Sequence, residues 1–246
     1  MNILCLISKN PEKRWCEFLS KFNNYKIYIV VDDNNFDLSK FNYDYKKINF
    51  IKIDDEKCKL NGYVNAEFKS DKIVNAWDKA LYYFGVENKN YEFIWFLEDD
   101  VFFHEENTLI QIDNQYSSED LLSNLYYPNT DNTHTNLWKW DDINIDYNEP
   151  YYSGYMNSVR VSKEMIECIN YYATKNDSLF YIDALFPTIA IKNNLKYITP
   201  TELSNVKQIK NYERKDINKK NLYHPENELN MHIYYRTHLI PHLIIQ

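Results

Sequence analysis

One apolar strand, followed directly by three acids, constrains this chain more than any other feature. Residues Phe93–Leu97 are five consecutive apolar residues, and Glu98, Asp99 and Asp100 follow them. A strand that is apolar on both faces belongs in the middle of a parallel sheet that helices cover. Ligands of such open sheets bind beyond the carboxyl ends of the strands. The pattern therefore predicts an α/β fold with acids at the ligand-binding edge.

Two earlier predicted strands also lead into acids. The strand Lys26–Val31 precedes Asp32 and Asp33, and the strand Ile48–Ile53 precedes a second pair of aspartates. With a first strand at Asn2–Ile7, the first hundred residues are predicted as strand, helix, strand, strand, helix, strand. That order is typical of an open α/β sheet. We therefore expect three acidic clusters along one edge of the sheet.

Two helices are expected between these strands. Pro11 is predicted to occupy the first position of one helix, where its missing N–H costs nothing. Ser70 and Asp71 are predicted to cap the other helix. Its buried stripe is expected to begin at Ile73, with Lys72, Asn75 and Lys79 off that stripe, and Gly85 is expected to end it.

The second half of the chain has a less regular pattern. Helices are predicted over Lys163–Tyr172 and Tyr181–Asn193, a strand or hairpin over Tyr151–Ser162, and helix with loop over Leu109–Leu125. Residues 205–221 are rich in Lys and Asn and are expected to be mobile. No linker separates two cores, so one domain over residues 1–246 is predicted.

The acids after the central strand form the strongest candidate site. Adjacent carboxylates repel one another and are costly to hold together without a cation. Oxygen ligands select hard cations such as Mn²⁺ or Mg²⁺. Successive residues of an extended segment point to opposite sides, so Glu98 and Asp100 are predicted to share one metal, while Asp99 takes a hydroxyl or an outer water. The alternative is a solvated loop of acids.

The sequence Phe-Leu-Glu-Asp-Asp-Val after a hydrophobic strand resembles the DxD-type motif of GT-A glycosyltransferases. Its Leu-Glu-Asp-Asp-Val form is similar to that of the lipopolysaccharide and collagen galactosyltransferase families. The resemblance implies a Rossmann-like GT-A fold with a mixed, mostly parallel sheet, and a metal held against the diphosphate of a nucleotide sugar. It implies Asp100 as the main metal ligand, Glu98 as a second ligand, and Asp99 facing the ribose or sugar of the donor.

The same resemblance implies donor contacts elsewhere. Asp32 and Asp33 stand where GT-A enzymes often receive the base or ribose, with an acidic turn as the alternative. Lys72 and Asn75, near a predicted helix start, suit a diphosphate, with a solvated helix face as the alternative. Gly154 resembles the glycine-containing loop between donor and acceptor, or is an ordinary turn.

Two further roles follow from the resemblance. Asp183 occupies the place of the acid that many inverting GT-A enzymes use as general base, or is an acid favoured by the helix dipole. His224 resembles the late histidine that is a third protein ligand to the metal, with His232 as the rival and a surface histidine as the alternative.

Trp138 and Trp140 are expected either to stack on an acceptor sugar or to anchor their loop.

The expected function is that of a metal-dependent, hexosyltransferase-like glycosyltransferase. It would move a sugar from a nucleotide-diphosphate sugar to a hydroxyl of a glycan or glycoprotein acceptor, inverting the anomeric centre if an acid is the base. Residues 1–104 would bind the donor and residues 105–246 the acceptor. The alternatives are a non-catalytic protein that binds nucleotide sugars or glycans, and a metal-dependent phosphodiesterase.

The net charge and the absence of several known motifs argue against other classes of protein. The net charge of -8 argues against a nucleic-acid partner. The chain lacks GxGxxG, GxxxxGK[ST] and GxSxG, which argues against nicotinamide, P-loop and hydrolase-elbow chemistry. The 4 cysteines form no CxxC pair, so free thiols in a reducing compartment are expected. Without a signal peptide or a long apolar run, a cytoplasmic protein with no transmembrane segment is predicted.

Overall fold

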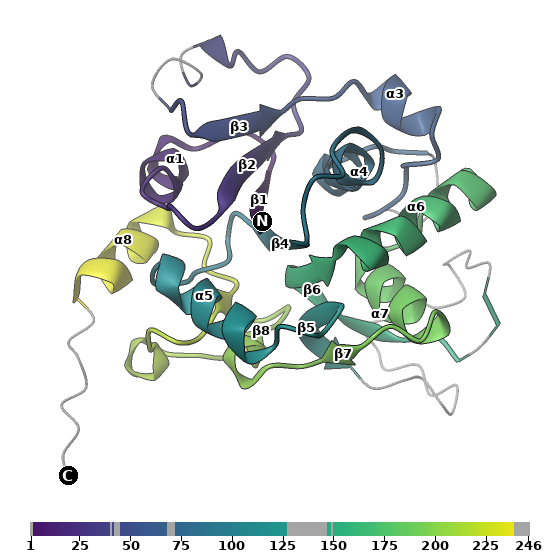
Figure 1. Ribbon diagram of the computed structural model, residues 1–246. Coiled ribbons are helices and arrows are strands. Elements are labelled where there is room, and N and C mark those ends of the chain that lie inside the picture. The colour runs from purple at the N-terminus through teal and green to yellow at the C-terminus, as the bar shows by residue number, and fades with distance from the viewer. Residues whose placement is uncertain are drawn as a thin grey trace.

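The computed structural model describes most of the chain, and the described residues are 2–39, 41, 45–67, 72–126, 147–148 and 150–238. Within this part lies a seven-stranded sheet with the strand order β3-β2-β1-β4-β6-β5-β7. Helices pack on both of its faces (Figure 1). None of the described helices is long and apolar enough to cross a membrane.

The amino-terminal half of the sheet is parallel. Its strands are β1 (Ile3–Ser8), β2 (Lys26–Val31), β3 (Ile48–Ile51) and β4 (Phe93–Glu98). β1 pairs with both β2 and β4, and β2 pairs with β3, all in parallel register. Because parallel strands end at the same edge, the residues that follow β2, β3 and β4 meet there. The four strands predicted from the sequence are confirmed, although β3 is shorter than expected.

The remaining strands complete a mixed sheet. β6 (Ser153–Ser162) runs antiparallel to β4 and to β5 (Leu121–Tyr126), and β7 (Tyr197–Ile198) runs parallel to β5. β8 (Asn205–Val206) and β9 (Tyr223–His224) form a separate parallel pair. The predicted mixed, mostly parallel α/β sheet flanked by helices is confirmed. Because β4 pairs with β6, the two predicted halves share one sheet.

Alternation along the strands divides the core into two layers. In β1, Cys5 faces a layer that includes Trp77, whereas Leu4 and Leu6 face a layer that includes Trp15. The first layer holds α4, α6 and α7, and the second holds α1 and α5 (Figure 1). The helices are α1 (Lys13–Leu19), α3 (Asp55–Lys59), α4 (Ala76–Tyr82), α5 (Glu106–Gln115), α6 (Lys163–Asn176), α7 (Ile182–Lys192) and α8 (Leu229–His238).

The start of α4 corrects the predicted cap. Ser70 and Asp71 lie outside the described residues, and the helix begins at Ala76 with Asn75 as its N-cap. The Asn75 side chain accepts the backbone N–H of Asp78 (3.2 Å), and the Asp78 carboxylate accepts the backbone N–H of Asn75 (3.0 Å). This reciprocal capping box satisfies two helix-end donors at once.

Other element boundaries also differ from the prediction. Ile73 precedes α4 and is 41% exposed, so it is not part of a buried stripe. Gly85 does not end the helix, because a π-helical turn (Tyr83–Glu87) continues it. A Cβ at Gly85 would collide with the Tyr63 hydroxyl, which explains the glycine through close packing. The prediction of Pro11 as the first helical residue is also wrong, since α1 begins at Lys13.

The segment that was expected to be mobile contains regular structure. Residues 205–221 include β8 and a 3₁₀ turn (Arg214–Asp216), and Ile217 is 1% exposed. Whether this segment moves stays a prediction. Trp138 and Trp140 lie outside the described residues. All 4 cysteines are free thiols, as expected.

A buried arginine links β6 to the end of α5. Arg160 is fully buried, and its guanidinium donates to the carbonyls of Tyr116 (2.6 Å) and Glu119 (2.8 Å) and to Asp113 Oδ1 (3.3 Å). The methionine variant Arg160→Met removes the donor to the Tyr116 and Glu119 carbonyls and the positive charge beside Asp113. We expect it to lower the free energy of unfolding by about 3 kcal/mol.

Urea unfolding followed by circular dichroism measures this loss. The control is Arg214→Met, because Arg214 is exposed and stacks on Tyr234 at the surface. We expect the control to change stability by less than about 1 kcal/mol. Equal effects of the two substitutions would show that the Arg160 contacts contribute little to the fold.

Candidate functional site

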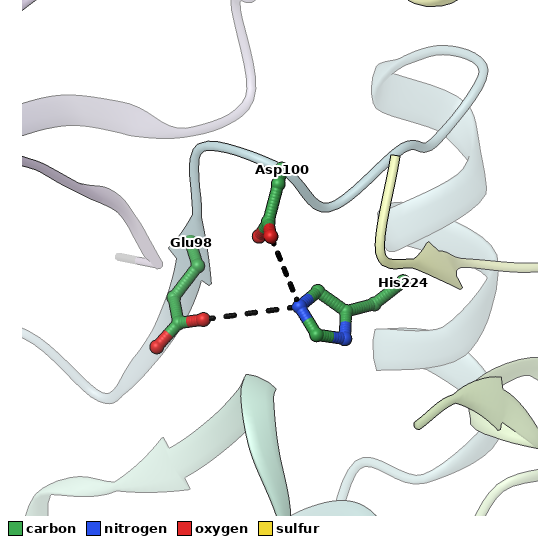
Figure 2. A group of neighbouring side chains, drawn as sticks. All are labelled: Glu98, Asp100 and His224. Atoms are coloured by element: carbon green, nitrogen blue, oxygen red, sulfur yellow. Dashed lines mark ion pairs between the residues drawn. The ribbon is translucent and has the colours of Figure 1, made fainter. Parts of the chain in front are cut away.

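The acids that follow β4 meet a histidine from the other end of the chain. His224 Nε2 lies 3.2 Å from Asp100 Oδ2 and 4.0 Å from Glu98 Oε2. One ligand atom from each of the three residues lies within 4.8 Å of the others. Figure 2 shows both carboxylates directed toward the imidazole. The structure therefore brings together the three residues predicted to bind a metal.

Backbone contacts bring the histidine to this edge. Phe102, just after the acids, pairs with Tyr223 through two backbone hydrogen bonds of 2.8 and 2.9 Å. The backbone N–H of Glu226 donates to the carbonyl of Asp100 (2.8 Å). These contacts fix β9, which carries His224, against the turn that follows β4.

A backbone carbonyl orients the imidazole of His224. His224 Nδ1 lies 2.5 Å from the backbone carbonyl of Lys207, so Nδ1 carries the hydrogen and Nε2 faces the acids. Burial alone would lower the pKa of His224, but the hydrogen bond and charge of Asp100 raise it overall. A proton on Nε2 and a metal ion would compete for the same position.

The donor set fits a divalent cation. Glu98 is held by two donors, Trp77 Nε1 (2.8 Å) and Asn157 Nδ2 (2.7 Å), while burial raises the pKa of its carboxyl. Asp100 Oδ1 is buried and has no hydrogen-bond partner among the described residues. An unpaired buried oxygen is costly, and a cation would satisfy it. Two carboxylates with one imidazole suit Mn²⁺, which accepts both oxygen and nitrogen ligands.

Asp99 points away from this cluster, as the alternation predicted. Its Oδ2 lies 2.7 Å from the Ser8 hydroxyl at the end of β1, and its carbonyl accepts Trp15 Nε1 (2.9 Å). Burial raises the pKa of the Asp99 carboxyl, and the contact with Ser8 opposes the shift. Contact of Asp99 with a donor sugar stays a prediction.

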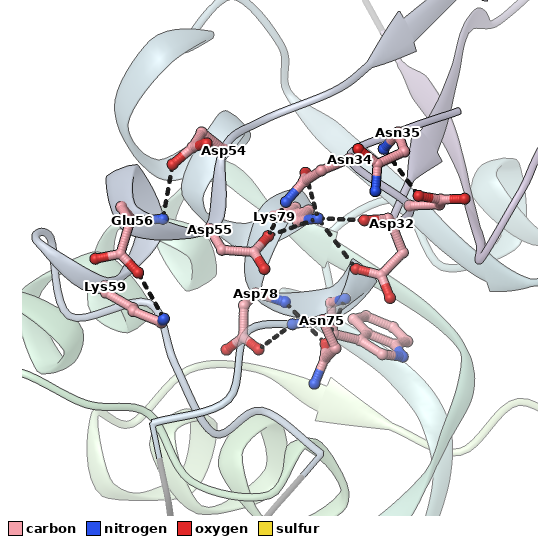
Figure 3. Close-up of polar contacts among 12 residues, drawn as sticks. Asp32, Asn34, Asn35, Asp54, Asp55, Glu56, Lys59, Asn75, Asp78 and Lys79 are labelled. Atoms are coloured by element: carbon pink, nitrogen blue, oxygen red, sulfur yellow. Dashed lines mark hydrogen bonds and ion pairs between the residues drawn. The ribbon is translucent and has the colours of Figure 1, made fainter. Parts of the chain in front are cut away.

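The loops after β2 and β3 are joined by a buried lysine. Lys79, on α4, is 1% exposed, and Nζ contacts Asp32 Oδ1 (3.2 Å), Asp55 Oδ1 (2.9 Å) and Asn34 Oδ1 (3.1 Å) (Figure 3). The expectation that Lys79 lies off the buried face is wrong. Asp33 Oδ1 instead accepts the backbone N–H two residues on (2.8 Å). Because Lys79 pairs with Oδ1 of Asp32, the other oxygen of that carboxylate can still accept hydrogen bonds from hydroxyl groups.

The two residues assigned to a helix start behave differently. Lys72 precedes α4 and pairs with Asp177 (3.1 Å), with both side chains exposed. Its predicted position at the helix start is wrong. Asn75 is 5% exposed and caps the helix, and its Nδ2 is buried without a partner among the described residues. Contact of either residue with a diphosphate stays a prediction.

Gly154 does not lie in a loop. It lies within β6, where it pairs with Leu125 of β5. A Cβ there would come within 2.6 Å of Met156 Cε and 2.9 Å of the Asn124 carbonyl. The predicted glycine loop is therefore wrong, because close packing inside the sheet accounts for this glycine.

Asp183 lies in the first turn of α7 and is 2% exposed. Its Oδ1 accepts the backbone N–H of Met156 (2.9 Å), and its Oδ2 accepts Gln208 Nε2 (3.2 Å). Burial raises its pKa to about 7, with the negative charge of Glu98 adding to the shift. Such a carboxyl changes protonation near neutral pH, which suits a general base.

Sequence reasoning missed two residues near this site. Gln208 contacts the Asp183 carboxylate, and Glu67 lies close enough to the acids for its pKa to respond to them. Burial first, and then the charges of Glu98 and Asp32, raise the pKa of Glu67 to about 7. Neither residue lies in a local motif, so no sequence signal identified them.

The rival histidine is structural. His232 is 1% exposed, and its Nε2 lies 2.8 Å from the Glu226 carbonyl. Its ring packs edge-on against Trp15 and Phe102, with ring centroids 5.4 Å apart in each case. His232 is not one of the three residues that form the cluster.

Comparison with known proteins gives structural likenesses at low sequence identity. No family model matches the chain, and no curated protein matches it. A 4-diphosphocytidyl-2C-methyl-D-erythritol synthase from Anaerococcus prevotii has a TM-score of 0.48 at 11% identity, covering 96% of this chain and 95% of that one. Mouse xyloside xylosyltransferase 1 has a TM-score of 0.43 at 11% identity, covering 81% and 85%. An active-site mutant of LgtC has a TM-score of 0.44 at 11% identity, covering 81% and 72%.

Proposed function

We propose that this protein is a GT-A-type glycosyltransferase. It moves a sugar, in the manner of a hexosyltransferase, from a nucleotide-diphosphate sugar to a hydroxyl of a glycan or glycoprotein acceptor. One observation supports this most: Glu98, Asp100 and His224 converge at the carboxyl edge of the sheet. The Lys207 carbonyl contacts His224 and the next residue, Gln208, donates to Asp183, so the proposed metal-ligand set and the candidate base are linked through two adjacent residues.

In this proposal Glu98, Asp100 and His224 hold Mn²⁺ or Mg²⁺. When bound, the ion neutralises charge on the diphosphate leaving group. Trp77 and Asn157 hold the Glu98 carboxylate in place. The Lys207 carbonyl keeps Nε2 of the histidine directed at the same point. These supporting hydrogen bonds fix the ligands before the ion arrives.

Asp183 acts as the general base. Its carboxylate takes the proton of an acceptor hydroxyl as the hydroxyl oxygen attacks the anomeric carbon and the bond from that carbon to the diphosphate oxygen breaks. The proton ends on Asp183, and the electron pair of the broken bond leaves with the diphosphate. Direct attack from the opposite face inverts the anomeric centre. A pKa of about 7 keeps much of Asp183 in the base form at neutral pH.

The donor nucleoside lies over the ends of β1 and β2. Asp32, Asp33 and Asp99 offer carboxylate oxygens to the hydroxyls of ribose or sugar. The buried Lys79 offsets part of the negative charge that these acids would otherwise place near an anionic donor. Lys72 and Asn75 are the candidates for contact with the diphosphate.

Metal removal tests this function directly. UDP-, GDP- and ADP-hexoses are offered with Mn²⁺, and nucleoside diphosphate release is measured with and without a mixture of methyl glycosides as acceptors. We expect release with at least one donor, and its loss in EDTA with recovery when Mn²⁺ is restored. Turnover that persists in EDTA would contradict a metal-dependent transferase. Donor binding without any release would indicate a non-catalytic binding protein.

A further inference from the structure

One short segment contacts both parts of the candidate site. The Lys207 carbonyl accepts from His224 Nδ1 (2.5 Å), and the next residue, Gln208, donates from Nε2 to Asp183 Oδ2 (3.2 Å). Two neighbouring residues therefore touch a candidate metal ligand and the candidate base.

Both ends of this segment are anchored. Val206 is fully buried, pairs with His224 between β8 and β9, and accepts Asn124 Nδ2 at its carbonyl (2.8 Å). Lys210 pairs with Glu226 (2.6 Å), which is 4% exposed. The residues between Val206 and Lys210 are therefore flanked on both sides by residues with partners elsewhere in the fold.

Of the three residues between Val206 and Lys210, Gln208 and Ile209 have exposed side chains. Ile209 is 76% exposed, and Gln208 is exposed although its amide reaches the buried Asp183 carboxylate. Among the described residues, the Gln208 side chain makes only this hydrogen bond. An amide offers two N–H donors and a carbonyl, so one donor and the carbonyl are left for another molecule.

The spacing matches a pair of neighbouring hydroxyls. Gln208 Nε2 and Asp183 Oδ2 are 3.2 Å apart, and the oxygens of a vicinal diol are separated by roughly one hydrogen-bond length. One hydroxyl can therefore donate to the carboxylate while its neighbour bonds to the amide. The C–H face of a sugar ring is apolar and complements an exposed isoleucine.

We propose that Gln208 and Ile209 form an acceptor subsite for a sugar that presents a vicinal diol. The reacting hydroxyl meets Asp183 Oδ2, the neighbouring hydroxyl bonds to the Gln208 amide, and the ring packs on Ile209. This inference rests on the proposed function for its choice of acceptor. It selects a glycan over an isolated hydroxyl of a peptide side chain.

The test compares a diol with its deoxy form. Ligand-observed NMR measures binding of methyl galactoside, glucoside and mannoside and of their monodeoxy derivatives to the wild type and to Gln208→Met. Methionine keeps the length of the side chain but removes the amide. We expect one deoxy derivative to bind the wild type about tenfold more weakly than its parent, and Gln208→Met to bind both equally.

The control is Gln111→Met on α5, since Gln111 is also an exposed glutamine. We expect it to keep the wild-type discrimination. A merely structural role of Gln208 would weaken parent and deoxy sugars alike, so preserved discrimination in Gln208→Met would overturn the proposal. Failure of every methyl glycoside to bind the wild type more tightly than about 50 mM would overturn it too.

This outcome is separate from that of the proposed function. Donor binding and turnover in Mn²⁺ test the transferase, whereas glycoside binding needs neither a donor nor a metal. If the protein binds a diol through Gln208 but never releases nucleoside diphosphate, the proposed subsite is supported and the proposed transferase activity is contradicted. If the protein releases nucleoside diphosphate but does not distinguish a diol from its deoxy form, the transferase activity is supported and the subsite is contradicted.

Discussion

Asparagine at position 183 is expected to lower the turnover of sugar transfer by about 10²–10⁴-fold. The amide cannot take the proton of the acceptor hydroxyl, yet it has the shape of the carboxylate and can still accept the Met156 N–H through its oxygen. Donor affinity in Mn²⁺ is expected to stay within about threefold of the wild type, because the proposed metal ligands are unchanged. Asp183→Asn should therefore separate binding from chemistry.

The pH profile adds a second readout for Asp183. Its pKa is about 7 without a metal because of burial and then the charge of Glu98. A cation at Glu98 offsets that charge. The apparent pKa at which the activity of the metal-loaded enzyme rises with pH should therefore be about 7 or lower. Activity of the wild type is expected to rise with pH through this pKa and then level off, since the base must be unprotonated.

Stopped assays of kcat and kcat/KM across pH measure both effects. The control is Glu164→Gln on the exposed side of α6, which also exchanges a carboxylate for an amide. We expect the control to keep the wild-type rate of transfer and the wild-type pH dependence. Transfer at the wild-type rate by Asp183→Asn would remove this residue as the base, and a retained anomeric configuration would show that it has another role.

Asparagine in place of Asp100 is expected to produce the largest loss of metal affinity. Outer-shell partners of metal ligands are worth about 10–100-fold in affinity, so loss of a direct carboxylate ligand should exceed about 100-fold. Metal-dependent donor binding and transfer should disappear together. The fold should persist, because Asp100 is bound to the rest of the site mainly through its backbone carbonyl and its contact with His224.

Calorimetric titration with Mn²⁺, followed by the donor, measures this change. Asp99→Asn is the matched control, since it makes the same substitution one residue away on the side that faces Ser8. We expect Asp99→Asn to keep Mn²⁺ affinity within about threefold and to weaken donor binding. Equal Mn²⁺ affinity in Asp100→Asn and the wild type would show that the metal assignment is wrong.

The sequence was most informative where one physical rule decided the outcome. The five apolar residues of β4 identified the central strand, because only a doubly covered strand tolerates that pattern. The period of two predicted that Asp99 would turn away from Glu98 and Asp100, and it does, although residues 99 and 100 form a turn closed by the Val101 N–H and the Glu98 carbonyl (3.0 Å) rather than an extended segment. These inferences needed no knowledge of distant parts of the chain.

Prediction failed where two local choices were equally good. Ser70 and Asn75 are both strong N-cap residues, and local preference cannot choose between them. Asp78 explains the choice in the structure, because its carboxylate bonds to the N–H of Asn75 (3.0 Å) and of Ala66 (3.1 Å). The second of these contacts is tertiary. The start of α4 therefore depends on packing that a local pattern does not contain.

Long-range polar contacts were the least predictable part of the site. Lys79 looked like a surface lysine, yet it is buried because acids from the ends of two strands surround its ammonium. Gln208 lies in a stretch rich in Lys and Asn with no motif, and only the path of β8 and β9 brings it to Asp183. Residues of this kind become visible only once the topology is known.

A metal-binding measurement tests the central proposal most directly. A crystal soaked with Mn²⁺ and a nucleoside diphosphate is measured at a wavelength where manganese scatters anomalously. We expect one strong peak about 2.0–2.3 Å from carboxylate oxygens of Glu98 and Asp100 and from Nε2 of His224, with phosphate oxygens as further ligands. A diphosphate bound elsewhere, with no manganese among these three side chains, would contradict it.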